Sequence, residues 1–330
     1  MSGGDGIRRW RLADGKEVGK QKGMSDFNAI SVSRDHRWAV CGTDEGASVW
    51  DAELHEKLVY VEGTNYVAAV DVSPDSTRFA TGTGSKVSIR SITNGKRLVG
   101  PLERDNWVTG VRFSPNGEHI AVTCYAGSVR IFNAWNSDQL MDIENVSPST
   151  MPNIPLAWSN DARQIFATSN DKKIRSFAVS TGSQVAESPI LDSDGFHKSI
   201  ALAPNGKFVV TYAGPSISFL DASTLSHIVP AIQDGEDIFS ITISPDGIYL
   251  VTGQAHGKIN VRNLGSILPH LYGPFHVGIC PLTMLAYRAS PIPSSPLTYY
   301  VRHLLATTVN LVNNPRRRAA TRTHDLTLTK

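Results

Sequence analysis

The sequence predicts an all-β fold in which four-stranded antiparallel sheets repeat around a common axis. Two markers in the chain carry this prediction. The first is the opening residue of a tight turn, which recurs every 40–45 residues at Ser33, Ser73, Ser114, Ser159, Ala203 and Ser244. The second is the last residue of a later strand, which recurs at Trp10, Trp50, Arg90, Phe132, Phe177, Leu220 and Arg262. Because both markers share the period of a four-stranded blade, the sequence is typical of a β-propeller.

The repeating unit is clearest in WVTGVRFSPNGEHIAVTCYAGSVRIFN, residues 107–133. Its first two strands, VTGVRFS and HIAVT, are rich in β-branched residues that favour strands. Between them, Ser114-Pro115-Asn116-Gly117 predicts a tight turn, since proline presets one φ angle and glycine permits a positive one. Ala126-Gly127 gives a second turn before the third strand, SVRIF. A more polar fourth strand follows in the successive units, as KLVYV, RLVGPL, QLMDI, QVAES and HIVPA.

The two ends of the chain complicate the blade count. Third and fourth strands occur seven times, beginning with GIRRWRL and KEVGK, whereas first and second strands occur six times. We therefore expect seven blades, six of them complete and one split or incomplete. Two C-terminal strands beside the N-terminal pair would close the ring, with LTMLAYRASP as the first strand, LTYYVRHLL as the second and Ser290-Pro291 at the turn.

This count divides the chain into three parts. Residues 1–269 are the propeller repeats, and residues 270–311 supply the blade-closing strands or else an irregular extension. Residues 312–330 lack periodicity and are expected to form a disordered basic tail. The alternative is that the chain is a fragment of a larger protein, with an open ring.

The pattern resembles the WD-repeat family over about residues 5–269. Trp50-Asp51 is the dipeptide that names that family, and GKRLVGPLERDNWVTGVRFSPNG is similar to repeats of fungal nucleotide-binding oligomerisation-type regulators. The family's Gly-His is replaced here by Glu103-Arg104, and its structural aspartate remains only as Asp5, Asp44 and Asp171. The resemblance therefore implies that the hydrogen-bonded network bracing each blade is mostly lost, with a lower stability.

Net charge, cysteine spacing and the distribution of apolar residues limit the classes of function that the sequence supports. The net charge of +2 is too small to indicate nucleic-acid binding by the whole chain. Cys41, Cys124 and Cys280 are too far apart for a zinc site or a disulfide framework, which indicates reduced thiols. The N-terminus has no apolar signal segment, and no stretch of about 18 apolar residues exists. We expect a cytoplasmic, intracellular protein, with the nucleus as an alternative.

No catalytic motif stands out. The sequence has no GxGxxG entering a helix, no GxxxxGK[ST], no HExxH and no GxSxG, so we expect no catalytic residues, cofactor or metal. His197, His227 and His256 are dispersed among different blades and are interpreted as structural or surface residues. The basic run 315–318 is interpreted as a solvated tail, with nuclear import or nucleic-acid contact as the alternative. Arg90 and Arg262 are interpreted as repeat decay, their heads in water, rather than as binding charges.

The rim of the propeller is the candidate binding surface, because loops from every blade meet there on a rigid scaffold. Positions just before the first strands include the aromatic residues Tyr66, Trp107 and Phe196, together with Asp237. Second-turn positions on the same rim are Asp44, Lys86, Tyr125, Asp171 and His256. Exposed Trp and Tyr side chains are enriched in binding hot spots. The alternative is that each aromatic folds over its own blade.

The sequence leaves three functional hypotheses. The first is a non-enzymatic scaffold that binds protein or peptide partners through the rim and channel mouth, with the sensor fragment of a larger regulator as an alternative. The second is a propeller hydrolase or lyase with an active site at the channel mouth, which would need several acid, base or metal-ligating groups to converge. The third, a sugar-binding propeller, would need near-identical pockets in every blade. We favour the scaffold, and disfavour membrane, nucleic-acid and small-molecule partners.

Overall fold

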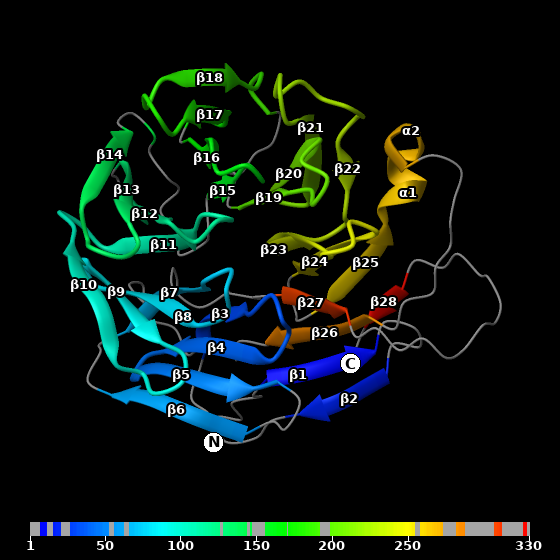
Figure 1. Ribbon diagram of the computed structural model, residues 1–330. Coiled ribbons are helices and arrows are strands. Elements are labelled where there is room, and N and C mark those ends of the chain that lie inside the picture. Colours follow the sequence, from blue (N-terminus) through cyan, green and yellow to red (C-terminus); the bar gives the residue numbers. More distant parts are fainter. Residues whose placement is uncertain are drawn as a thin grey trace, which may run out of the picture.

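The computed structural model shows a ring of four-stranded antiparallel sheets (Figure 1). The described residues are 7–11, 16–20, 27–52, 56–62, 66–125, 128–143, 146, 156–169, 171–191, 199–254, 258–272, 282–287, 307–311 and 326–328.

Six blades follow one another around the ring. Their first strands lie nearest the axis and are β3 (Phe27–Val32), β7 (Val67–Val72), β11 (Val108–Phe113), β15 (Leu156–Trp158), β19 (Ile200–Leu202) and β23 (Ile238–Ile243). The second strands are β4 (Trp38–Thr43), β8 (Arg78–Thr83), β12 (His119–Cys124), β16 (Gln164–Thr168), β20 (Phe208–Ala213) and β24 (Tyr249–Gln254).

The outer half of each blade is built the same way. The third strands are β5 (Gly46–Asp51), β9 (Lys86–Ser91), β13 (Val129–Asn133), β17 (Ile174–Ala178), β21 (Ser216–Asp221) and β25 (Ile259–Asn263). The fourth strands, at the edge of the ring, are β6 (Glu56–Glu62), β10 (Arg97–Glu103), β14 (Gln139–Ile143), β18 (Gln184–Glu187), β22 (Ile232–Gln233) and β28 (Leu326–Leu328). We number these blades 1 to 6, from β3–β6 to β23–β25 with β28.

The outer strands of blades 5 and 6 differ from the sequence prediction. In blade 5, HIVPA contributes only the bridge between Leu220 and His227, and the outer strand is the two-residue β22 that follows. In blade 6, two short helices, α1 (Leu264–Ile267) and α2 (Pro269–Tyr272), follow the third strand. The outer position is taken by β28, which pairs antiparallel with β25. This strand lies in the segment 312–330, where the sequence predicted no structure.

A further sheet joins the two ends of the chain, in the order β2 (Lys16–Lys20), β1 (Ile7–Arg11), β26 (Leu282–Tyr287), β27 (Thr307–Leu311). We call it the closing sheet. The expected strand order is wrong. The strand within LTMLAYRASP pairs with β1 and so holds the second position, and β27 holds the first. LTYYVRHLL and Ser290-Pro291 lie outside the described residues.

The predicted turn chemistry explains how strands one and two connect. In blade 3, the Ser114 hydroxyl accepts a hydrogen bond from the His119 amide at 2.9 Å, and the Gly117 amide donates to the Ser114 carbonyl at 2.8 Å. Gly117 has φ of 72°, a region that glycine enters without a steric penalty. The same turn position is filled by His36, Ser76, Ala162, Gly206 and Gly247, all with positive φ. The turn is therefore kept even where glycine is absent.

The hydrophobic core lies between blades rather than within one sheet. One cluster joins Val87, Ile89 and Leu102 of blade 2 to Val111 and Ile120 of blade 3. Equivalent clusters join blades 1 and 2, blades 3 and 4, blades 4 and 5, and blades 5 and 6. Each blade therefore buries its apolar faces only against its neighbours, as expected for a repeat array.

Polar contacts also cross from blade to blade. Asp71 of blade 2 accepts hydrogen bonds from the Ser31 hydroxyl of blade 1 at 3.1 Å and from the Phe113 amide of blade 3 at 2.8 Å. Its carboxylate also lies 3.5 Å from the Arg112 guanidinium. Asp71 is 5% exposed, so these bonds are buried at the inner strands of three consecutive blades. They brace neighbouring blades against one another, whereas the expected loss of the network within each blade stays a prediction.

Candidate functional site

The rim that carries the predicted binding residues is built from two kinds of loop. One kind links a fourth strand to the next first strand, and the other links second and third strands. In blades 2 and 3 they are joined by backbone hydrogen bonds from Val108 to Gly84 at 2.7 Å and from Arg104 to Ser85 at 2.8 Å. The Tyr125 amide donates to the Trp107 carbonyl at 2.8 Å. The structure therefore brings Trp107, Lys86 and Tyr125 to one rim, which we call the upper rim.

Trp107 and Tyr125 form the most exposed aromatic pair on this rim. Trp107 is 64% exposed and Tyr125 is 43% exposed. The amide of Trp107 donates a hydrogen bond to the side-chain oxygen of Asn106 at 2.9 Å, directly before the start of β11. Large aromatics so exposed on a rigid loop present apolar area that a partner could bury.

Charged side chains surround this pair. Arg130 donates to Asp142 at 2.5 Å and to Asp105 at 2.6 Å. Burial lowers the pKa of Arg130, but the hydrogen bonds from it to the two carboxylates raise that pKa overall. Lys86 lies 3.4 Å from Glu103, and both side chains are exposed. The rim of blades 2 and 3 therefore combines exposed aromatics with paired charges.

Arg104 lies beneath this rim, at the position where the sequence lacks the Gly-His of the family it resembles. The residue is only 7% exposed. Its Nε donates to the Cys124 sulfur at 3.0 Å and its Nη2 to the Ser128 carbonyl at 3.2 Å. Its Nη1 is buried and has no hydrogen-bond partner. Burial raises the pKa of the Cys124 thiol, although Arg104 itself lowers it, so the thiol stays neutral.

Blade 6 has a different buried group at the matching place. Asp234 precedes β23 as Arg104 precedes β11, and it is also buried. Its carboxylate accepts from Thr252 at 2.6 Å and from Asn260 at 3.1 Å, and it forms an ion pair with Arg262. Arg262 therefore points into the protein. The prediction that the charged head of Arg262 lies in water is wrong.

Arg90, the other arginine at the end of a third strand, is also held within the protein. Its Nη1 donates to the Gly95 carbonyl at 3.1 Å. Burial lowers its pKa, and the charge of Arg97 lowers it further. These contacts contradict the expected solvation of the two arginine heads, and the interpretation that neither binds a partner stays a prediction.

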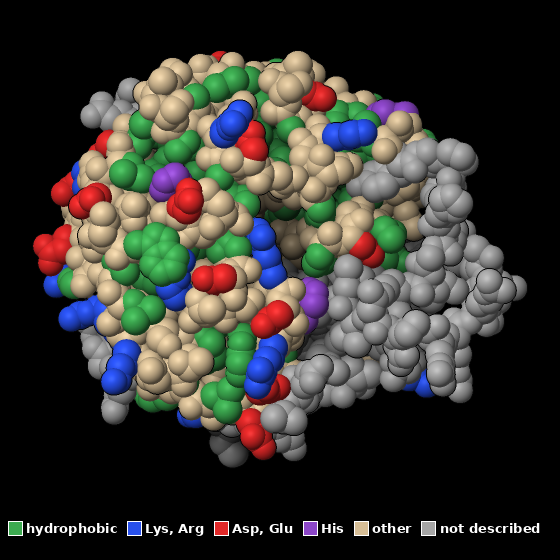
Figure 2. Space-filling model, in the orientation of Figure 1, with side chains coloured by type: hydrophobic (Ala, Val, Ile, Leu, Met, Phe, Trp, Pro, Cys, Tyr) green, Lys and Arg blue, Asp and Glu red, His purple; other side chains and the backbone are tan. Residues whose placement is uncertain are grey.

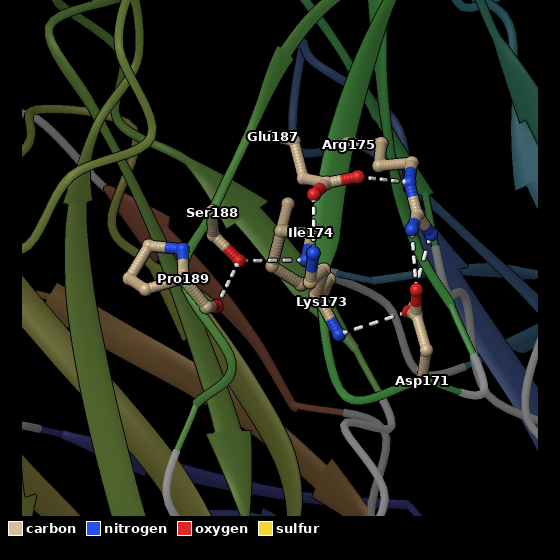
Figure 3. A network of polar contacts seen from close by, with 7 residues as sticks. All are labelled: Asp171, Lys173, Ile174, Arg175, Glu187, Ser188 and Pro189. Carbon is tan, nitrogen blue, oxygen red and sulfur yellow. Dashed lines mark hydrogen bonds and ion pairs between the residues drawn. The ribbon is translucent and has the colours of Figure 1, made fainter.

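Asp171 on the rim of blade 4 belongs to a local network of charges (Figure 3). It forms an ion pair with Arg175 and accepts from the Lys173 amide at 3.3 Å. Arg175 also donates to Glu187 at 2.8 Å, and Lys173 pairs with the same carboxylate. The hydrogen bond from Arg175 holds the pKa of Asp171 below its usual value. Asp171 is therefore already paired within its own blade.

The remaining predicted rim residues fall into two groups. Asp44 accepts a hydrogen bond from Asn28 at 2.9 Å, Tyr66 is half-buried and Asp237 is exposed. Phe196 and His256 lie outside the described residues, so their places on the rim stay predictions. The sequence analysis missed two features, the burial of Arg104 and the exposure of Trp135. The missing Gly-His dipeptide was the only signal that pointed to Arg104.

Trp135 lies at the opposite end of blade 3, in the turn between β13 and β14, and is 60% exposed. The guanidinium of Arg78 stacks on its ring at 3.6 Å from the centroid. Arg78 also donates to the carbonyls of Ala134 at 2.8 Å and Gly117 at 3.0 Å. This arginine therefore fastens blade 2 to the lower turns of blade 3, and Trp135 covers it.

The face of the ring drawn in Figure 2 is hollowed near its centre, and basic side chains lie at one edge of the hollow. Acidic and basic side chains are mixed over the rest of that face. Within the described part of the chain, no three His, Cys, Asp or Glu side chains meet in a way that could hold a metal ion. Nor is any described helix long and apolar enough to cross a bilayer.

Comparison with known proteins gives one family model, "WD domain, G-beta repeat", which matches residues 96–133. This segment contains the outer strand of blade 2 and most of blade 3, including the upper rim around Trp107.

Relatives match larger parts of the chain. The small ribosomal subunit protein RACK1 of Drosophila melanogaster is 29% identical over 181 residues, which are 51% of this chain and 56% of the relative. RACK1 of Caenorhabditis elegans is 28% identical, over 45% of this chain and 48% of the relative. Actin-interacting protein 1-2 of Arabidopsis thaliana is 28% identical, over 46% of this chain and 25% of the relative. The matches to RACK1 thus span about half the length of those relatives.

A solved structure resembles the fold over most of the chain. The β-propeller domain of Cps50 (Swd1) from Myceliophteria thermophila superposes with a TM-score of 0.67 at 16% identity. The match covers 80% of this chain and 98% of that domain. At this identity the likeness concerns the arrangement of the blades alone.

Proposed function

We propose that this chain, which is similar to WD-repeat proteins, is a non-enzymatic scaffold that binds a protein or peptide partner through the upper rim of blade 3. The carrying observation is the exposed pair Trp107 and Tyr125, held together by the hydrogen bond between their backbones. A fixed backbone lowers the entropy lost on binding, and two aromatics side by side on a rim supply the kind of area that dominates hot spots.

The neighbouring charges fit this use. Asp105 and Glu103 are strongly exposed, so they can meet a partner's polar groups at the edge of the contact. Exposed charges at the edge of an interface contribute mainly to association rate and orientation. The aromatic pair would supply most of the affinity, and the charges would set how the partner approaches.

Other predicted rim residues enter the proposal with smaller roles. Asp44, Lys86 and Asp171 are already engaged with Asn28, Glu103 and Arg175, so a partner would have to compete for them. Tyr66 and Asp237 can extend the contact toward blades 2 and 6. Residence in the cytoplasm, or in the nucleus, remains a prediction from the sequence, as does the narrower similarity to the repeats of fungal regulators.

We also propose that the closing sheet acts as a seventh blade. Its innermost strand, β27, contacts β23 of blade 6 on one side and β3 of blade 1 on the other, which supports a closed ring. A closed ring leaves no blade with an unprotected inner face. The upper rim would then be part of a continuous circle of loops.

The test of the scaffold function is affinity capture followed by a binding measurement with one purified partner. The Trp107→Ala and Tyr125→Ala double variant should lower the partner's affinity at least about 30-fold, the size of a hot-spot loss of 2 kcal/mol. Trp135→Ala is the matched control, because it removes an equally exposed tryptophan from the opposite rim of the same blade. Circular dichroism should show all variants folded.

Two outcomes would contradict the proposal. If the double variant keeps the affinity of the wild type, the upper rim of blade 3 is not the binding surface. If Trp135→Ala lowers the affinity instead, the partner binds the lower end of the propeller.

A further inference from the structure

Arg104 is a buried cation whose charge is not balanced nearby. Its carbonyl and thiol partners, Ser128 and Cys124, are both neutral, and within the described residues no carboxylate pairs with it. A buried ion without an opposite charge is costly, and unmatched N–H groups in the interior cost free energy as well. Such an arrangement is expected where a further acceptor completes the contact.

Blade 6 shows what a complete arrangement at this place looks like. The carboxylate of Asp234 is met by Arg262, Thr252 and Asn260. The Asp234 charge is balanced there from within the blade and both of its carboxylate oxygens have partners, although Nη1 of Arg262 and Oδ1 of Asn260 make no hydrogen bond. At Arg104, by contrast, the two hydrogens of Nη1 have no acceptor. Matching places in two blades therefore differ in charge balance: Asp234 is paired with Arg262, whereas Arg104 has no ion pair among the described residues.

The carboxylates of the two residues adjacent to Arg104 in the chain do not pair with its guanidinium. Asp105 follows Arg104 directly but is turned outward, where its carboxylate pairs with Arg130. Glu103 precedes Arg104 and pairs with Lys86. Both acidic neighbours of Arg104 therefore form ion pairs with other residues.

From this contrast we propose that the upper rim of blade 3 binds an oxyanion, a phosphate or a carboxylate, through the Nη1 group of Arg104. A planar guanidinium offers parallel N–H donors that suit both kinds of oxyanion. Because Nη1 is closed to solvent, the anion enters by displacing side chains of the rim. Trp107 lies three residues after Arg104 and Tyr125 directly after Cys124, so these exposed aromatics stand where that entry occurs.

The experiment measures the thermal unfolding midpoint of the full chain against inorganic phosphate, with sodium chloride added to keep ionic strength constant. The expected result is a saturable rise, roughly 2 °C at about ten times the dissociation constant. A second titration with N-acetylaspartate amide tests a carboxylate of the kind that a partner protein carries. A rise with phosphate alone identifies a free or covalently attached phosphate, and a rise with the carboxylate alone identifies an acidic side chain.

Two variants test whether the rise in the unfolding midpoint depends on Arg104. Arg104→Gln and Arg104→His should each abolish the saturable rise, because both remove the permanent positive charge and the forked donors of the guanidinium. Arg175→Gln is the control, since Arg175 is an arginine of blade 4 whose partners, Asp171 and Glu187, already satisfy it. It should keep the rise of the wild type. An equal rise in Arg104→Gln, or the same midpoint in phosphate and chloride, would overturn the proposal.

Hydrogen exchange of the wild type gives a measurement that does not depend on how the variants fold. Phosphate or the carboxylate should slow exchange in residues 103–107 and around Cys124, and leave blade 4 unchanged. Slowing elsewhere, or none, would count against Arg104 as the site. The inference does not rest on the proposed scaffold function, because an inorganic ion can bind here whether or not a protein partner does.

Discussion

Removing the carboxylate of Asp71 tests whether polar bonds between blades hold this propeller together. The buried Phe113 amide would lose its acceptor, at a cost of about 1–3 kcal/mol. Ser31 and Arg112 are half-buried and keep some contact with water, so their losses add about 1 kcal/mol together. We therefore expect Asp71→Ala to lower the free energy of unfolding by about 2–4 kcal/mol, measured by urea denaturation with circular dichroism.

Asp71→Asn separates hydrogen bonding from charge. The amide oxygen of asparagine can still accept from Phe113, so the expected loss is about 1 kcal/mol. Asp75→Ala is the matched control, because Asp75 lies in the same blade and its carboxylate accepts only within its own turn, from Ser73 and Thr77. Its loss should be about 1 kcal/mol. An Asp71→Ala variant within about 0.5 kcal/mol of the wild type would refute the bracing argument.

The pH dependence gives a second signature of Asp71. Burial raises the pKa of this carboxyl above its usual 3.8, although Arg112 and the hydrogen bonds from Phe113 and Ser31 lower it in part. A raised pKa in the folded state means that folding favours the protonated form. As pH falls through the folded-state pKa toward 3.8, the wild type should gain stability relative to Asp71→Asn, which does not titrate. A difference between the two proteins that stays constant with pH would contradict the assigned direction.

Two further predictions concern blade 6 and the closing sheet. Asp234→Ala should lower the free energy of unfolding by about 3–5 kcal/mol, because it leaves Arg262 buried without its partner. In the same denaturation assay, the double variant with Arg262→Met should lose at least about 1 kcal/mol less than the sum of the two single losses. Additive losses would show that the pair does not interact. Limited proteolysis followed by mass spectrometry should protect residues 282–287 together with residues 7–11, because β26 pairs with β1 along its length. Early cleavage of either segment while the other stays protected would show an open ring.

Local chemistry was sufficient to predict the repeats. Turn residues such as Ser114 and Gly117 act within a few positions of one another, so their pattern shows directly in the sequence. The same holds for the strands that those turns connect, and for the place of Trp107 and Tyr125 in neighbouring loops. The all-β propeller and its repeating blades followed from these short-range signals, whereas the predicted total of seven blades depended on pairing between the two ends of the chain.

The sequence by itself therefore determined the blades, their order and the loops that form the upper rim. Tertiary structure alone decided that β26 takes the second position of the closing sheet and that β28 completes blade 6, because these pairings join segments far apart in the chain. It also decided which charges are buried. Arg104 and Asp234 occupy matching places in their blades, yet one is satisfied and the other is not, because the partners of each come from strands and turns whose side chains meet only when the blade has folded.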